Sequence, residues 1–270
     1  MLLLLLNIMV IGLIKFATWN VNSLKVRLSY ILDWIKFFNI DVLALQETKL
    51  QNKEFPEKIF FDLGYYVMFN GQKSYNGVAI ISKFPIMKSV INYKNLGWLG
   101  ARILAVTILD IRIINVYVPN GFNMNSEKFL YKLMWLEDLI SFIKSQLYFY
   151  SKLIILGDFN IAPRDNDVYD SIRIKDCLLV SKIERDFFFR ILSLGFKDIF
   201  SVFLKNKRFF SWWDYRFNSF KLNKGFRIDH ILLSDNLLKM CIDFGIDKYL
   251  RGLNKPSDHV PVWCMLNYII

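Results

Sequence analysis

Residues 153–160 read Leu-Ile-Ile-Leu-Gly-Asp-Phe-Asn. The apolar run predicts a buried strand, and Asp158 and Asn160 follow it directly. Because residues i and i+2 of a strand point to the same side, both polar side chains are expected to face one site, and Gly157 allows another group to approach closely. A carboxylate beside an amide can activate a water molecule and hold a phosphate oxygen. Two polar groups beside a core strand are costly unless they are used, so this stretch indicates a functional site.

The rest of the chain surrounds this strand with similar short strands and a few amphipathic helices. Strands are expected at 14–20, 42–45, 65–70, 78–82, 101–109, 111–118, 153–156, 209–215, 227–234 and 260–266. Helices are expected at 29–38, from 125 or 126 to 147, and at 183–194. Since no linker interrupts this pattern, we predict a single α+β domain over residues 14–270, in which two sheets pack together with helices outside.

The apolar composition requires a test for membrane insertion, because 54% of the 270 residues are hydrophobic. The only candidate span is residues 1–14, which Asn7 and Gly12 interrupt and Lys15 ends. This is shorter than the roughly 20 residues that a spanning helix needs. It also lacks the basic start and small-residue cleavage site of a signal peptide. Residues 1–13 are therefore interpreted as an apolar extension, either a longer first strand or the product of an upstream start codon.

The charge balance favours a polyanionic partner. The formal net charge is +11 and the isoelectric point is near 9.4, as expected for a chain that binds nucleic acid or an anionic membrane. An AT-rich genome would also inflate the lysine content, so the charge is only mild support. The three cysteines are odd in number and scattered, which indicates a reducing compartment without a disulfide framework.

Polar side chains also stand at the ends of other predicted strands. Asn20 and Asn22 share a face after the first strand, although turn-forming asparagines would look the same. Glu47 ends a buried strand, where a carboxylate must be paired, hydrated or bound to a metal; a salt bridge to Lys49 is the alternative. Tyr117 ends another strand and either packs or stabilises charge.

The two histidines lie in similar surroundings. Asp258 and His259 precede a short apolar run, and such a pair can bind a metal or take a proton. Asp229 lies within a β-pattern stretch, where a buried carboxylate needs a donor, and His259 is the natural one. His230 faces the other way and is expected to be structural.

Taken together, these clusters resemble the endonuclease/exonuclease/phosphatase superfamily, and within it the exonuclease III branch of apurinic/apyrimidinic endonucleases. The resemblance runs from residue 14 nearly to the C-terminus, and two features narrow the branch. One is the aromatic block at 210–216; the other is the loop around Lys73 and Tyr75, which is similar to a loop that grips the DNA backbone. The motifs are Thr-Trp-Asn-Val-Asn at 18–22, Gln-Glu-Thr-Lys at 46–49, Asn-Val-Tyr-Val-Pro-Asn at 115–120, Gly-Asp-Phe-Asn at 157–160, Arg-Ile-Asp at 227–229 and Ser-Asp-His at 257–259.

The resemblance implies a DNase I-like four-layer α/β sandwich whose site lies where the loops of two sheets meet. It implies Glu47 as the main ligand of a Mg²⁺ ion, for which Mn²⁺ would substitute. The rest of the implied metal environment, direct or through water, is Asn20, Asp158, Asn160, Asp258 and His259.

The resemblance also implies catalytic roles. Asp158 transfers a proton, Asn160 orients the phosphate or the water, and Tyr117 supports transition-state charge. His259, paired with Asp229, contacts the scissile phosphate. The implied substrate-binding residues are Asn22, Lys73, Tyr75, Asn120, Trp212, Phe226 and Ile228, of which the last three line a pocket for the base-free sugar.

Three positions depart from the family pattern. Asn22 stands where some members carry an acid, which leaves a second metal open. Position 226 is aromatic here but aliphatic in some bacterial members. Asn123 stands where some relatives insert an arginine into the DNA.

The expected function is a Mg²⁺-dependent phosphodiesterase that cuts duplex DNA 5′ to an abasic site. It would also trim blocked 3′ ends and degrade DNA from 3′ to 5′, as a cytoplasmic, nucleoid-associated monomer with no stable protein partner and no membrane attachment. The rival hypotheses are a phosphomonoesterase acting on lipid or inositol phosphates and a non-catalytic DNA-binding module. The choice of Asp158 or His259 as general base stays open at this point.

Overall fold

The computed structural model describes residues 11–91, 93, 100–204 and 207–269. Two six-stranded mixed sheets form its centre. The first has the order β11-β12-β1-β2-β4-β3, and the second has the order β5-β6-β7-β8-β10-β9. The first sheet consists of β1 (Ile11–Asn20), β2 (Val42–Gln46), β3 (Tyr66–Asn70), β4 (Val78–Ser82), β11 (Cys241–Ile246) and β12 (Val262–Ile269). The second consists of β5 (Ile86–Val90), β6 (Ile103–Ile108), β7 (Ile111–Tyr117), β8 (Leu153–Asp158), β9 (Phe196–Asp198) and β10 (Asp229–Ser234).

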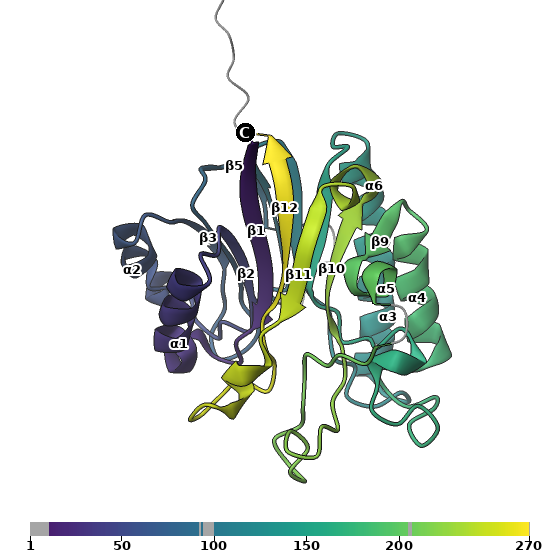
Figure 1. Ribbon diagram of the computed structural model, residues 1–270. Coiled ribbons are helices and arrows are strands. Elements are labelled where there is room, and N and C mark those ends of the chain that lie inside the picture. The colour runs from purple at the N-terminus through teal and green to yellow at the C-terminus, as the bar shows by residue number, and fades with distance from the viewer. Residues whose placement is uncertain (1–10, 92, 94–99, 205–206, 270) are drawn as a thin grey trace, which may run out of the picture.

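The longer helices lie outside the two sheets, which makes four layers (Figure 1). The first sheet is flanked by α1 (Leu24–Phe37) and α2 (Glu57–Asp62), and the second by α3 (Glu127–Leu147) and α4 (Lys182–Leu192). The short helix α5 (Ile199–Phe203) follows β9 and contributes Ile199 and Phe200 to the core between the sheets. A short helix, α6 (Asp235–Leu238), follows β10, and the short 3₁₀ turns are η1 (Asn52–Glu54), η3 (Asp165–Asp167) and η4 (Lys248–Gly252). The predicted α+β class and the four-layer sandwich are confirmed.

Each interface between layers has its own apolar core. Side chains from the inner faces of both sheets form the central one, including Ile14 and Val106. The helix α1 packs on the first sheet through residues such as Trp34, while α3 packs on the second through residues such as Leu139. Strands such as β2, β4 and β8 are buried along their whole length because sheet or helix covers both faces, and this explains their continuous apolar runs.

The sequence prediction differs from the structure in several elements. The segment 209–215 is not a strand: Trp212 makes only isolated bridges to Phe226 and His259, because this segment crosses the loop edge between the sheets. The strands β5 and β11 were not predicted, since β5 is largely exposed, β11 is only half-buried, and neither has a continuous apolar run. The helix α1 begins at Leu24 rather than at residue 29.

The first strand begins within the predicted N-terminal extension. Residues 11–13 belong to β1 and pair with residues 267–269 of β12. Residues 1–10 lie outside the described part of the chain. Among the described residues, no helix is both long and apolar enough to cross a bilayer.

Sheet register brings the polar strand ends to one edge of the molecule. In the first sheet β1 and β2 run parallel, with Asn20 opposite Gln46. In the second sheet β7 and β8 run parallel, with Tyr117 opposite Asp158. The antiparallel strand β10 begins at that same edge, so that Asp229 is opposite Asp158. Four strand ends and one strand start therefore meet at the lower edge in Figure 1, where the connecting loops gather.

Candidate active site

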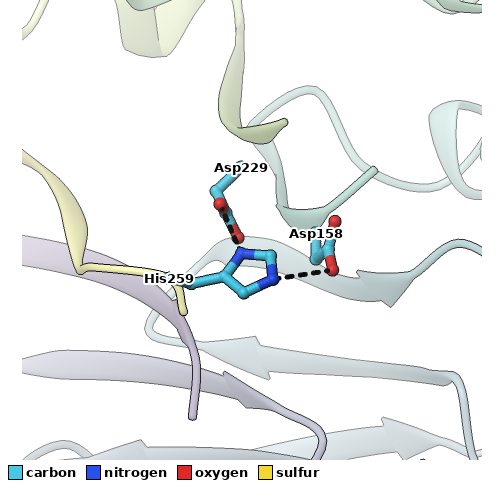
Figure 2. A group of neighbouring side chains, drawn as sticks. All are labelled: Asp158, Asp229 and His259. Carbon is cyan, nitrogen blue, oxygen red and sulfur yellow. Dashed lines mark hydrogen bonds and ion pairs between the residues drawn. The ribbon is translucent and has the colours of Figure 1, made fainter. Parts of the chain in front are cut away.

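The centre of the site is a buried row of three side chains, Asp229, His259 and Asp158 (Figure 2). His259 Nδ1 lies 2.8 Å from Asp229 Oδ2, and His259 Nε2 lies 3.7 Å from Asp158 Oδ2. The Ser211 hydroxyl donates a 2.6 Å hydrogen bond to the same Asp229 oxygen. Since a carboxylate accepts, Nδ1 carries a proton and Nε2 is the ring atom directed at Asp158 and the open site.

The charges in this row shift the pKa values of its members. Although burial opposes a charged ring, the carboxylates of Asp229 and Asp158 raise the pKa of His259 to about 10. Burial raises the pKa of Asp158, despite the neighbouring His259 imidazolium. His259 is therefore an imidazolium at neutral pH, and Asp158 is the group in this row with proton affinity suited to a base.

Glu47 stands directly after β2 with a left-handed backbone, φ 52°. Its Oε1 accepts hydrogen bonds of 2.9 Å from Asn20 Nδ2 and from the Tyr117 hydroxyl. Its Oε2 lies 3.0 Å from Lys49 Nζ. Burial and the Glu47 carboxylate raise the pKa of Tyr117 well above its usual range, so the phenol stays a donor. A non-glycine residue in the left-handed region is costly, which is typical of functional positions.

Asn20 joins the two carboxylates of the site. Its amide nitrogen donates to Glu47 and, at 2.9 Å, to Asp158 Oδ2. Its amide oxygen accepts from the backbone N–H of Asn22 at 3.0 Å, which fixes the orientation of the amide. Asn20 therefore presents N–H groups, rather than an oxygen, to the carboxylates.

Asn160 is held in the same site by its neighbours. Its backbone is left-handed, φ 48°, and its N–H donates to Asp158 Oδ1 at 2.9 Å. Its amide nitrogen donates to the Val118 carbonyl at 2.9 Å, and its amide oxygen accepts from Asn120 Nδ2 at 3.0 Å. The predicted close approach at Gly157 is observed: a Cβ there would lie 2.0 Å from the Val116 carbonyl oxygen of β7.

Asp258 completes the acidic groups of the site. Its Oδ2 accepts from Trp212 Nε1 at 2.9 Å, and its Oδ1 accepts from Asn22 Nδ2 at 3.0 Å. Although burial opposes its charge, the His259 imidazolium and these two hydrogen bonds hold the pKa of Asp258 below its usual value. Asp258 is therefore a carboxylate at neutral pH.

Most of these groups line one cavity of about 180 Å³, whereas Asn20 and Asp229 contact the lining residues from outside its wall. It has a polar side that contains the acids, amides and imidazole, and an apolar side formed by Leu179, Trp212 and Ile228. The lining residues are Glu47, Tyr117, Asn120, Asp158, Asn160, Leu179, Trp212, Ile228, Asp258 and His259.

Some predicted residues lie beside this cavity rather than in its wall. Phe226 lines an adjacent cavity together with Trp212, which lines both, and the centroids of the two rings are 5.5 Å apart. Asn22 reaches the site through Asp258. Lys73 and Tyr75 are exposed on the loop between β3 and β4 and do not line the cavity.

The donor set fits a divalent cation of the Mg²⁺ type. Glu47 and Asp258 line the same cavity, and carboxylate oxygens are the ligands that Mg²⁺ prefers. Asp158, Asp229 and His259 also lie close enough to share an ion, with ligand atoms within 4.8 Å of one another. There the imidazolium already neutralises the carboxylates, so a cation at that position would have to displace its proton. At Glu47 the competing cation is the Lys49 ammonium, whose side chain is 29% exposed and can move into solvent, whereas the His259 ring is buried. Glu47 and Asp258 therefore fit the ion better.

Other residues of the site have weak sequence signals. Leu179 lies in a loop without regular structure, and Ser211 is a single hydroxyl within an aromatic block. Gln46 and Asn115 join the two sheets behind the site through a 2.7 Å amide hydrogen bond, yet each reads as an ordinary strand residue. The expectation for His230 holds: Nε2 contacts the Ile161 carbonyl at 2.9 Å and Nδ1 contacts Arg227 Nη1 at 2.9 Å, away from the cavity.

The fold and the site together define a hydrolytic enzyme of the four-layer α/β sandwich class. The chain belongs to the endonuclease/exonuclease/phosphatase family, whose model matches residues 17–259.

Curated relatives match nearly the whole chain. It is 33% identical to exodeoxyribonuclease III of Haemophilus influenzae over 264 residues, which covers 92% of this chain and 98% of the relative. It is 30% identical to an exodeoxyribonuclease of Bacillus subtilis, with 94% and 99% covered.

Solved structures agree with this assignment. A Neisseria 3′ phosphatase bound to a product DNA hairpin superposes with a TM-score of 0.93 at 37% identity, covering 94% of this chain and 100% of that one. An AP endonuclease from Archaeoglobus fulgidus gives 0.91 at 36% identity, with the same coverage.

Proposed function

We propose that this chain is a Mg²⁺-dependent DNA repair phosphodiesterase that incises duplex DNA 5′ to abasic sites. On the same proposal it removes blocking groups from 3′ ends and degrades DNA from 3′ to 5′. The relatives named as exodeoxyribonucleases, the 3′ phosphatase and the AP endonuclease support this choice, because one phosphoester site with an open end would serve all of these reactions.

The cavity carries the proposal for abasic DNA. It places the proton-handling groups directly beside an apolar wall of Leu179, Trp212 and Ile228. Its 180 Å³ is below the roughly 300–1,000 Å³ of typical ligand pockets. A deoxyribose without its base would fit such a space, whereas a complete nucleoside would be excluded by size. Flipping an abasic sugar also costs less than flipping a paired nucleotide.

The reaction follows from the charges of the site. Asp158 acts as the base that takes the proton from the attacking water, with Asn160 and Asn20 holding its carboxylate in place. The His259 imidazolium, fixed by Asp229, contacts the scissile phosphate and offsets its developing charge. The Tyr117 hydroxyl, which donates to Glu47 without substrate, would turn to the phosphate and support its developing charge. Glu47 and Asp258 would hold the Mg²⁺ ion, which neutralises charge on the phosphate and leaving oxygens when bound.

The proposal also covers the oligomeric state and the cellular compartment. We infer a single catalytic domain that works as a monomer in the cytoplasm, near the nucleoid. Cys177, Cys241 and Cys264 are all free thiols, as expected in a reducing compartment.

A duplex with one abasic site tests the proposal. Incubation with and without Mg²⁺, followed by separation of the product ends, should give a 3′-hydroxyl and a 5′-deoxyribose phosphate only when the metal is present. A nicked duplex with a 3′ phosphate should be trimmed in parallel, and Asp158→Asn is the inactive control.

The two rival hypotheses predict other products. Release of inorganic phosphate from an inositol phosphate, without DNA cleavage, would favour a phosphomonoesterase. Tight duplex binding without any cleavage would favour a non-catalytic module.

A further inference from the structure

A lysine and a glutamate behind the site form an ion pair that is completely buried. Lys132 of α3 and Glu184 of α4 bind each other with both side chains at 0% exposure. Charged side chains are almost never fully buried unless they are paired, and such a pair is seldom more stabilising than apolar side chains of similar volume. Its presence at this position therefore calls for a reason other than stability.

The lysine ammonium is connected directly to two residues that line the cavity. Besides Glu184, Lys132 Nζ donates to the Asn160 carbonyl at 2.7 Å and to the Asn120 carbonyl at 3.3 Å. All three donors of the ammonium are thus in use. Asn120 and Asn160 both line the cavity and bind each other through their side chains at 3.0 Å.

The glutamate is connected to the opposite, apolar wall. Its carboxylate accepts from the backbone N–H of Leu179 at 3.2 Å and from the Ser181 hydroxyl at 2.6 Å. Leu179 forms part of the apolar wall, and its carbonyl accepts from the Ala162 N–H at 2.7 Å. The ion pair therefore contacts both the amide side and the apolar side of the cavity from behind.

We propose that the Lys132–Glu184 ion pair is a positioning device for the active site, which holds the Asn160 and Asn120 backbones and the Leu179 wall in one arrangement. Asn160 has a left-handed backbone that the surrounding structure must maintain, and an ammonium can hold its carbonyl where an apolar side chain cannot. Neither charged residue lines the cavity, so both act through the residues they hold. The activity readout of this inference rests on the proposed nuclease function.

The test separates positioning from stability by comparing single and double variants. Lys132→Met and Glu184→Leu should each lower the melting temperature, on the order of 10 °C, because each leaves an unpaired buried charge. The double variant Lys132→Met/Glu184→Leu should recover much of that loss. Its kcat on abasic duplex should nevertheless stay roughly 10- to 100-fold below the wild type with little change in KM, as is typical when a supporting residue is removed.

A second measurement does not depend on activity. Hydrogen exchange of the 158–162 segment should be faster in the double variant than in the wild type, because the Asn160 carbonyl has lost its donor. If the wild type cleaves no DNA, the proposed function fails, yet this exchange measurement still decides whether the ion pair positions the segment.

The exposed ion pair between the same two helices is the matched control. Arg190 and Glu137 also join α4 to α3, with contacts of 2.8 Å, but both are about half exposed. Arg190→Met/Glu137→Leu should leave kcat and the exchange of residues 158–162 unchanged.

Recovery of both melting temperature and kcat in the buried double variant, with native exchange at 158–162, would overturn the proposal. Should that variant not fold, Lys132→Gln/Glu184→Gln takes its place, since it keeps neutral donors and acceptors. It should lose about tenfold in kcat, and native activity with native exchange would again overturn the proposal.

Discussion

Asp229 binds the ring of His259 through a 2.8 Å contact between Oδ2 and Nδ1. Asp229 begins β10 of the second sheet, whereas His259 lies in the loop that leads into β12 of the first, 30 positions further along the chain. The contact decides which ring nitrogen faces the cavity, and it helps to keep the ring charged at neutral pH. Through this contact Asp229, which does not line the cavity, controls the charge and orientation of His259, which does.

Asp229→Asn should keep the shape of the site but remove the charge that fixes the ring. We expect kcat on abasic duplex to fall by roughly 10²–10⁴, with little change in KM, because the imidazolium is lost or turned. Steady-state kinetics on one substrate would show the split. Asp235→Asn, in the exposed first turn of α6 at the far edge, serves as control. A native kcat in Asp229→Asn would remove Asp229 from the mechanism.

Glu47→Ala should abolish Mg²⁺-dependent cleavage while the fold survives. Glu47 accepts from Asn20 and Tyr117 at the loop edge and supports no core contact, so we expect a small change in melting temperature. Calorimetric titration with Mn²⁺ should show the loss of a binding site, whereas the exposed Glu57→Ala should bind metal as the wild type does. Full cleavage by the wild type in EDTA would contradict a metal mechanism altogether.

Trp212→Ala should reduce the preference for abasic over undamaged duplex. The indole forms part of the apolar wall and donates to Asp258, so its loss opens the cavity toward the adjacent one that Phe226 lines. Trp212→Phe keeps most of the wall and loses only the hydrogen bond, so it should retain more of the preference. Cleavage rates on both substrates and thermal unfolding should be measured for each variant. If stability drops while the ratio of rates stays constant, Trp212 is a core residue and not a pocket wall.

Lys73→Ala should make DNA binding less sensitive to salt. Each neutralised phosphate contributes a slope of about −0.9 in log K against log salt on duplex DNA, and Lys73 is exposed on the loop between β3 and β4. Affinity measured over a salt series should therefore give a slope that is shallower by about 0.9, the contribution of one phosphate contact. Lys239→Ala, beyond α6 at the opposite edge, should leave the slope unchanged. Equal slopes for all three proteins would place the DNA elsewhere.

His230 should make the protein sensitive to mild acid. Burial and the neighbouring Arg227 guanidinium lower its pKa from 6.5 to about 3. The unfolded chain thus takes up this proton first, so the His230 contribution to stability falls as pH decreases from about 6.5 toward 3, by up to ~1.4 kcal/mol per pH unit. Asp158, whose pKa is raised in the folded state, contributes a slope of opposite sign, so the His230 contribution is measured as the difference between wild type and variant. His230→Gln, which does not titrate, should flatten this slope in urea unfolding between about pH 6.5 and 4.5. An identical slope in the variant would mean that His230 is protonated in the folded protein.

The sequence alone determined where the polar groups stand along the strands. Apolar runs that end in Asn20, Glu47, Tyr117 and Asp158 are local patterns, and local patterns specify strands and the faces of their residues. This is why the two-sheet class, most strands and the acids, amide and imidazole of the cavity could be predicted, whereas Asn120, Trp212 and Ile228 were expected only from the resemblance. The resemblance to one superfamily added the expectation that these strand ends share a site.

Only the tertiary structure decided how these groups face one another. Sheet order and register place Asp229 opposite Asp158. The orientation of the Asn20 amide is fixed by a hydrogen bond from the backbone N–H of Asn22, which no sequence pattern indicates. The sequence predicts a strand for the aromatic segment at 209–215, yet no strand pairs with it along its length, so it forms a loop. From this loop the Ser211 hydroxyl donates a hydrogen bond to Asp229, and Trp212 Nε1 donates one to Asp258. Leu179, Lys132 and Glu184 act through contacts with residues distant in the chain. Such contacts depend on which strand ends the fold brings together, and a sequence pattern within one element contains no information about them.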